Sequence, residues 1–112
     1  MLVAIHPAYA AATPEQLAAA NVNGCGPGGW RVDLIPDHLG DVDITDACNL
    51  HDYLYYLGGS EEDRLMADVL LYTNIAAKIL LNDGHLVPLQ MAAAAIFYRA
   101  VRNGGAAFFG VK

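Results

Sequence analysis

Two adjacent glycines, Gly58 and Gly59, divide the strongest helix-forming part of this chain, and they constrain its fold more than any other feature. A helix is expected to begin near Asp43 to Asp46 and to end at Leu57, because glycine commonly follows the last residue of a helix. Ser60 follows as an N-cap, with three acidic residues in the next turn, where they suit the helix dipole. A second helix is therefore expected to run to about Leu81. So short a turn makes the two helices antiparallel neighbours.

Two further helices are expected on either side of this pair. Thr13 and Pro14 read as the N-cap and first residue of a short helix over about residues 14–21. A last helix is expected from about Pro88 to Asn103, with Gly104 and Gly105 after it. Residues 30–40 are expected to be irregular, and the sequence shows no convincing strand alternation, although it is compatible with a tiny hairpin. The predicted class is mainly α.

The composition is that of one small folded domain spanning residues 1–112. The chain is 55% hydrophobic and only 16% charged, which argues against disorder and leaves a large apolar share to be buried or displayed. Its net charge of −6 disfavours binding to nucleic acid, which needs basic surfaces. No transmembrane segment is expected, because the charge-free stretch from Gly84 to Tyr98 is too short and too polar.

The first candidate for chemistry is the loop Asn23–Gly29, in which four of the last six residues are glycine. The loop follows a helix and carries no lysine, so it does not match a phosphate-binding P-loop. Closely spaced glycines allow successive carbonyl oxygens to point at one spot, and hard cations such as Ca²⁺ accept such ligands. A plain connecting loop would have the same composition.

The second candidate is a stripe of polar residues on the helix that ends at Leu57. Cys48, His51, Asp52 and Tyr55 are spaced i, i+3, i+4 and i+7, so they share one helix face. This mixture differs from the aliphatic pattern of a core. A carboxylate beside an inward-facing histidine needs a partner such as a metal ion, because an unpaired buried charge is costly. An exposed His-Asp pair is the alternative.

The next helix adds Asp68 and Tyr72, which lie one turn apart in an otherwise apolar stretch. The two-glycine turn allows Asp68 to reach either the level of His51 or a level one helical turn nearer to the glycines. A carboxylate on the far nitrogen of an imidazole orients the histidine in hydrolytic enzymes. Asp63 is the rival partner, but its place in the first turn of the helix is explained by capping. The two cysteines of the chain are compatible with either one disulfide or two buried thiols.

Two segments of the chain together resemble motifs of the secreted phospholipase A2 superfamily. They are Cys25-Gly26-Pro27-Gly28-Gly29 and Cys48-Asn49-Leu50-His51-Asp52-Tyr53-Leu54-Tyr55. The segment from Ala67 to Tyr72 is similar to a motif of its smaller prokaryotic and phage-type members. The resemblance implies two long antiparallel helices, a glycine-rich calcium loop and short flanking helices. It also implies a disulfide between Cys25 and Cys48, which would place the protein outside the cytoplasm, as a secreted or otherwise extracytoplasmic protein.

The resemblance further implies calcium-dependent hydrolysis of the sn-2 ester of phospholipids at a membrane or micelle interface. His51 would activate water, Asp68 would orient it, and Tyr55 and Tyr72 would hydrogen-bond Asp68. The implied Ca²⁺ ligands are the carbonyls of Gly24, Gly26 and Gly28 and the carboxylate of Asp52, and the oxyanion would be held by Ca²⁺ and the N–H of Gly26.

Three points stay open at this level. Trp30, next to the calcium loop, is either a core residue or part of a lipid-contacting rim. Residues 1–12 include the small-x-small sequence Ala8-Tyr9-Ala10 but no basic region, so they are either mature sequence or the remnant of a signal or propeptide. An inactive scaffold of the same fold and an unrelated helical domain are the alternative functions.

Overall fold

The chain is mainly helical, as predicted. The computed structural model describes residues 2–20 and 38–110. In order along the chain, the elements within these ranges are α1 (Pro7–Ala10), α2 (Pro14–Ala19), β1 (His38–Leu39), β2 (Val42–Asp43), α3 (Thr45–Leu57), α4 (Glu61–Asn82), α5 (Val87–Gly104) and the 3₁₀ turn η1 (Gly105–Ala107). The glycine loop Asn23–Gly29 and Trp30 lie outside the described residues.

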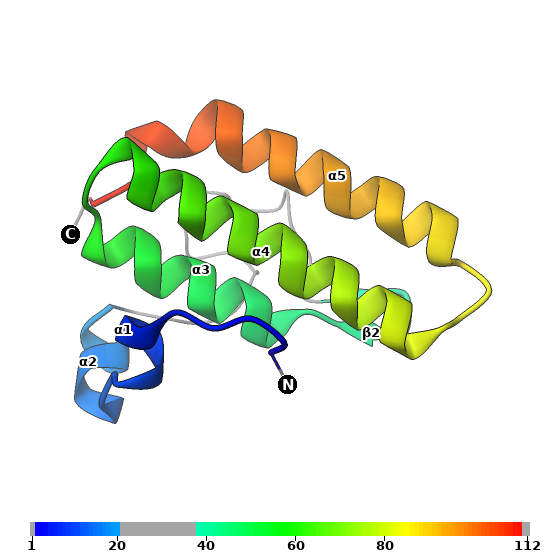
Figure 1. The fold of residues 1–112 in the computed structure, drawn as a ribbon, viewed down its shortest axis with the longest axis horizontal. Helices are drawn as coiled ribbons and strands as arrows, with labels where there is room; N and C mark the ends of the chain where they lie inside the picture. Colours follow the sequence, from blue (N-terminus) through cyan, green and yellow to red (C-terminus); the bar gives the residue numbers. More distant parts are fainter. Residues whose placement is uncertain (1, 21–37, 111–112) are drawn as a thin grey trace.

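Helices α3 and α4 form the antiparallel hairpin that the two glycines predict (Figure 1). Gly58 has a φ of 73°, and its N–H donates to the Leu54 carbonyl, which ends α3. A side chain is disfavoured at this φ, and a Cβ would lie 2.8 Å from the Cα of Gly110. Ser60 then begins α4 with a capping box, in which the Ser60 and Asp63 side chains each accept the other residue's backbone N–H.

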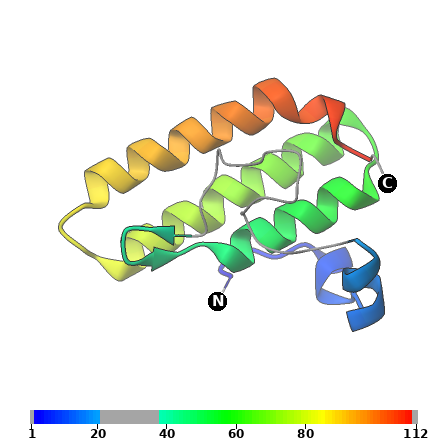
Figure 2. The same cartoon turned by 180° about the vertical axis from the view of Figure 1, so that it is seen from behind.

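Helix α5 confirms the helix predicted from about Pro88 to Asn103, but it is not the short flanking helix of the predicted architecture. It contains 18 residues against 13 in α3, and it packs along α4 on the side away from α3 (Figures 1 and 2). Its C-terminal carbonyls are bound by Arg64 of α4, whose Nη1 donates to the carbonyl oxygens of Val101 and Arg102. A buried arginine therefore satisfies groups that a helix end leaves unpaired.

A two-stranded hairpin, with which the sequence was compatible, begins at the end of the segment expected to be irregular. Leu39 pairs with Val42 across a turn in which Gly40 has a φ of 63°. The hairpin leads directly into α3 and is fastened to α5, because Gln90 donates to the Leu39 carbonyl at 2.8 Å. The periodicity of so short a strand is too weak to distinguish it from a loop.

The N-terminal segment is bound to α4 through one side chain. The buried Asn74 side chain accepts hydrogen bonds from the N–H groups of Val3 and Ala4 and donates to the Ala4 carbonyl, at 2.8–3.0 Å. Helix α1 follows, capped by the His6 side chain, and contacts α3. Sequence reasoning did not predict α1, and it extended the next helix to residue 21, whereas α2 ends at Ala19.

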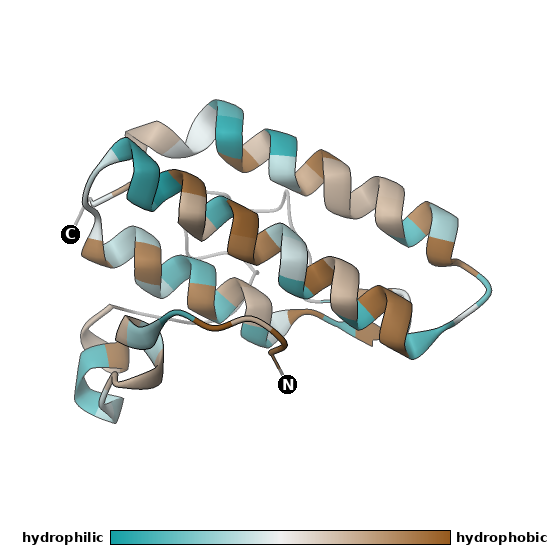
Figure 3. Cartoon of the chain, in the orientation of Figure 1, coloured by the Kyte–Doolittle hydropathy of each residue, from teal (hydrophilic) through white to brown (hydrophobic). Residues whose placement is uncertain are grey.

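The high apolar content is divided between the core and one surface. The core lies where α4 packs against α3 and α5, with Leu71, Ile75, Ile79 and Val101 at most 1% exposed. The outer face of α4 is also apolar, with Leu65, Met66, Val69, Leu80 and Leu81 exposed (Figure 3). By length and composition α4 could also cross a membrane, although a core helix of a soluble protein passes the same test.

Candidate active site

His51 of α3 and Asp68 of α4 meet in the interior of the helical hairpin. The Nε2 atom of His51 lies 2.7 Å from Oδ1 of Asp68, and the two side chains are 2% and 0% exposed. The turn at Gly58 and Gly59 folds the helices back so that the two residues reach the same level. The contact that was expected between them is therefore present, and the rival Asp63 instead caps α4 with Ser60.

Tyr55 completes the α3 side of the cluster. Its hydroxyl donates to Oδ1 of Asp68 at 2.8 Å, and its ring lies 4.3 Å from that of His51, centroid to centroid. The helical spacing of four residues places both side chains on the face toward α4. Burial and the hydrogen bond to Asp68 raise the pKa of the Tyr55 hydroxyl well above its ordinary value, so the hydroxyl remains a donor at neutral pH.

Two arginines hold the other side of the Asp68 carboxylate, and sequence reasoning missed both. Arg102 of α5 donates from Nη1 to Oδ2 of Asp68 at 2.8 Å, and Nη1 of Arg64 lies 3.6 Å from the same oxygen. Glu61 forms an ion pair with Arg64 at 2.9 Å and lies 3.7 Å from Arg102. The spacing of Arg64 and Asp68, i and i+4 on one helix, was a signal available in the sequence; no comparable signal marks Arg102.

These contacts keep Asp68 ionised despite its burial. Burial alone raises the pKa of the Asp68 carboxyl, but the hydrogen bond and charge of His51 and the hydrogen bonds from Tyr55 and Arg102 outweigh it. The net pKa lies below the ordinary value for aspartate. An ionised carboxylate only accepts hydrogen bonds, so Nε2 of His51 carries the proton in this contact. A neutral His51 then has its basic lone pair on Nδ1, as a general base requires.

Tyr72 does not support Asp68, contrary to expectation. Within the described part of the chain, its ring packs against Tyr98 of α5, with 5.8 Å between centroids, and no hydrogen bond joins it to Asp68. The physical reason is that the carboxylate is already surrounded by His51, Tyr55 and Arg102. Arg102 donates the further hydrogen bond to Asp68 that had been expected from Tyr72.

The predicted calcium site is only partly within the described residues. Asp52 lies half-buried on α3, directly after His51, whereas Gly24, Gly26 and Gly28 lie outside. Within residues 2–20 and 38–110, no group of three or more His, Cys, Asp or Glu side chains is arranged so that it could hold a metal ion. The predicted donors are all oxygens, one carboxylate with backbone carbonyls, and this chemistry suits Ca²⁺.

The predicted disulfide also has one half outside the described residues. Cys48 is buried in α3, three residues before His51, and Cys25 lies in the glycine loop. The pairing therefore stays a prediction.

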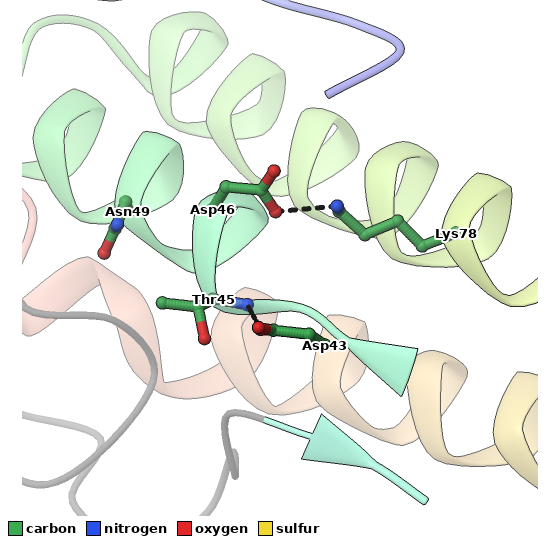
Figure 4. Close-up of a pocket in the computed structure, with 5 residues that line it drawn as sticks. All are labelled: Asp43, Thr45, Asp46, Asn49 and Lys78. Atoms are coloured by element: carbon green, nitrogen blue, oxygen red, sulfur yellow. Dashed lines mark hydrogen bonds and ion pairs between the residues drawn. The ribbon is translucent and has the colours of Figure 1, made fainter. Parts of the chain in front are cut away.

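A polar pocket of about 290 Å³ lies at the beginning of α3. Figure 4 shows Asp43, Thr45, Asp46 and Asn49 around it, with Lys78 reaching in from α4. Lys78 pairs with Asp46 at 2.8 Å, and the Asp43 carboxylate accepts the Thr45 N–H at 2.8 Å. The lining includes neither His51 nor Asp68, so this pocket is separate from the buried cluster.

Comparison with known proteins identified no relatives. No family model, curated protein or solved structure matches the chain. Any assignment therefore depends on the chain's own residues and their geometry.

Proposed function

We propose that this protein is a calcium-dependent phospholipase A2 that hydrolyses the sn-2 ester of glycerophospholipids, with the fold of the small, single-disulfide members of that superfamily. The observation that supports this most is the buried hydrogen bond between His51 and Asp68, with Tyr55 on the same carboxylate oxygen. It involves residues of two separate motifs. The orientation of the imidazole is the one that a hydrolytic base needs.

In the proposed reaction, Nδ1 of His51 takes a proton from water as the water oxygen attacks the ester carbonyl. Asp68 holds the ring through Nε2 and stabilises the imidazolium that forms. The proton then passes from Nδ1 to the departing glycerol oxygen, which gives a fatty acid and a lysophospholipid. Histidine suits this exchange because an imidazole can both accept and release a proton near neutral pH.

The oxyanion of the tetrahedral intermediate would be bound by the backbone N–H of Gly26. Calcium, held by Asp52 and the carbonyls of Gly24, Gly26 and Gly28, would supply positive charge beside that oxygen. A substrate at a lipid interface also agrees with the exposed apolar side chains of α4 and of the N-terminal segment, where Val3 and Ile5 are more than half exposed.

The deciding experiment measures fatty-acid release from mixed phospholipid vesicles, with calcium and with a chelator. His51→Gln should lower the rate by about 10²–10⁴-fold, the usual contribution of a general base. The matched control is His85→Gln, because His85 is exposed on the connection between α4 and α5. Hydrolysis that survives His51→Gln, or that ignores the chelator, would refute the proposal.

Two further measurements separate this function from its alternatives. Calcium should raise the melting temperature of the wild type but not of Asp52→Asn, whereas an unrelated helical domain would show no such shift. An inactive scaffold would bind calcium and vesicles but release no fatty acid. Comparison of anionic with zwitterionic vesicles tests the charge argument, because a chain of net charge −6 should not prefer anionic lipid.

A further inference from the structure

The Asp68 carboxylate is held by three helices, and its two oxygens face different partners. Oδ1 accepts hydrogen bonds from His51 and Tyr55 of α3, and Oδ2 accepts one from Arg102 of α5. The terminal torsion of an aspartate is soft and allows a broad range of angles. Nη1 of Arg64 lies 3.6 Å from Oδ2, beyond hydrogen-bond distance, so within the described residues the bond from Arg102 is the hydrogen bond that holds Oδ2 and sets which way the carboxylate faces.

Arg102 is itself held in place by charged neighbours. The Arg64 side chain is buried, and its guanidinium donates to the Arg102 carbonyl and pairs with Glu61 through two nitrogens. Glu61 also lies 3.7 Å from the Arg102 guanidinium. The carboxylates of Glu61 and Asp68 and the guanidiniums of Arg64 and Arg102 therefore form one network of alternating charge. The end of α5 is tied to α4 at the level of the Asp68 carboxylate.

We propose that Arg102 is a positioning residue for the reaction centre: it orients the Asp68 carboxylate so that Oδ1 faces His51 and keeps the imidazole in the tautomer with its proton on Nε2. Its importance for catalysis rests on the proposed function. Its effect on the imidazole does not, because the contacts among Arg102, Asp68 and His51 exist whatever reaction the site performs.

A purely structural role is the competing explanation, in which Arg102 only fastens the last turn of α5. The two roles differ in what they do to His51. A structural tether affects the melting temperature alone. A positioning residue also affects which ring nitrogen of His51 carries the proton, because an Asp68 that turns away no longer accepts from Nε2.

The test compares Arg102→Gln, Arg102→Lys and the matched control Arg99→Gln. Arg99 is on the same helix one turn earlier and is exposed. Long-range proton–nitrogen NMR on calcium-free protein identifies the tautomer of His51 and the hydrogen-bonded Nε2–H signal. Fatty-acid release from vesicles gives kcat and KM separately.

In Arg102→Gln we expect the Nε2–H signal to weaken or disappear and kcat to fall roughly 10- to 100-fold, with KM little changed. Arg102→Lys should have an Nε2–H signal and a kcat between those of Arg102→Gln and the wild type, because lysine restores a charge but not the planar guanidinium. Arg99→Gln should match the wild type in both measurements.

A wild-type tautomer and kcat in Arg102→Gln would overturn the proposal. If Arg102→Gln does not fold, Arg102→Lys provides the test. A wild-type tautomer and a wild-type kcat in Arg102→Lys would then overturn the proposal. A tautomer change in a protein with no lipase activity would refute only the proposed function. Normal activity that depends on His51 but not on Arg102 would refute only the positioning role.

Discussion

Asp68 shows how much one residue can reveal before a fold is known. A carboxylate within the apolar run around it is out of place, and this alone indicated a buried partner. Its contacts with His51 and Tyr55 follow from helical periodicity, because these two residues share the face of α3 that packs against α4. Its contact with Arg102, 34 residues away, depends on how α5 packs, which local spacing does not encode.

At this scale we predict that Asp68→Asn destabilises the fold by about 3–5 kcal/mol at neutral pH, because it removes the buried carboxylate that pairs with Arg64 and Arg102 and leaves, among the described residues, only the exposed Glu61 as their counter-charge. The pKa of Asp68 is lower in the folded state than the unfolded value of about 3.9. The stability it contributes is therefore present above that pH and is lost as the pH falls through the folded pKa.

Urea unfolding at pH 7, 5 and 3 measures this difference. The difference in free energy of unfolding between the wild type and Asp68→Asn should be similar at pH 7 and 5 and should become smaller below pH 4. Asp83→Asn is the control, because Asp83 is exposed and its left-handed backbone suits asparagine equally well. An equal difference in free energy of unfolding at all three pH values would show that the ionised form of Asp68 does not stabilise the fold.

At the scale of elements, the two glycines at the end of α5 have different roles. They were interpreted together as a helix stop, but α5 includes Gly104, and only Gly105 touches the candidate site. A Cβ at Gly105 would collide with the Tyr55 hydroxyl, whereas a Cβ at Gly104 would meet nothing within 4 Å. Gly105 therefore allows α5 to approach the tyrosine that binds Asp68.

We predict that Gly105→Ala displaces Tyr55 from Asp68, destabilises the protein by about 1–3 kcal/mol and lowers the hydrolysis rate, because a well-packed interior resists an added methyl group. Gly104→Ala should leave stability unchanged or raise it by up to about 1 kcal/mol, since alanine is the better helix former. Thermal unfolding and vesicle assays on the pair provide the comparison. Equal effects of the two substitutions would contradict the packing explanation.

At the scale of the whole molecule, the glycine loop and α3 should be joined by a disulfide between Cys25 and Cys48. Such a bond closes a loop of about two dozen residues, which corresponds to roughly 3 kcal/mol in the chain-entropy model. It would also hold the proposed calcium ligands next to Asp52, one turn from Cys48.

Reduction of the wild type should therefore lower its free energy of unfolding by about 3 kcal/mol. The variant Cys25→Ser should be as unstable as the reduced wild type and should not respond to the reductant. Alkylation of the denatured, non-reduced protein followed by mass spectrometry gives a direct check. Modification of both cysteines would show that the bond does not exist.

The sequence by itself determined what local interactions control: the mainly helical class, the α3–α4 hairpin at Gly58 and Gly59, the Ser60 cap, and a polar stripe on α3 facing Asp68. Caps, turns and helical periodicity act over a few residues, so they can be deduced without a fold. The relation of the stripe to the glycine loop, by contrast, was an inference from resemblance.

Only the tertiary structure decided which distant groups complete the cluster. Helix α5 packs along α4, Arg102 donates the hydrogen bond that had been expected from Tyr72, and the N-terminal segment binds Asn74. These contacts join residues 34 to 71 positions apart. Their partners are selected by the packing of whole helices rather than by the spacing of neighbouring residues, because a side chain on a helix face can meet whichever element packs against that face.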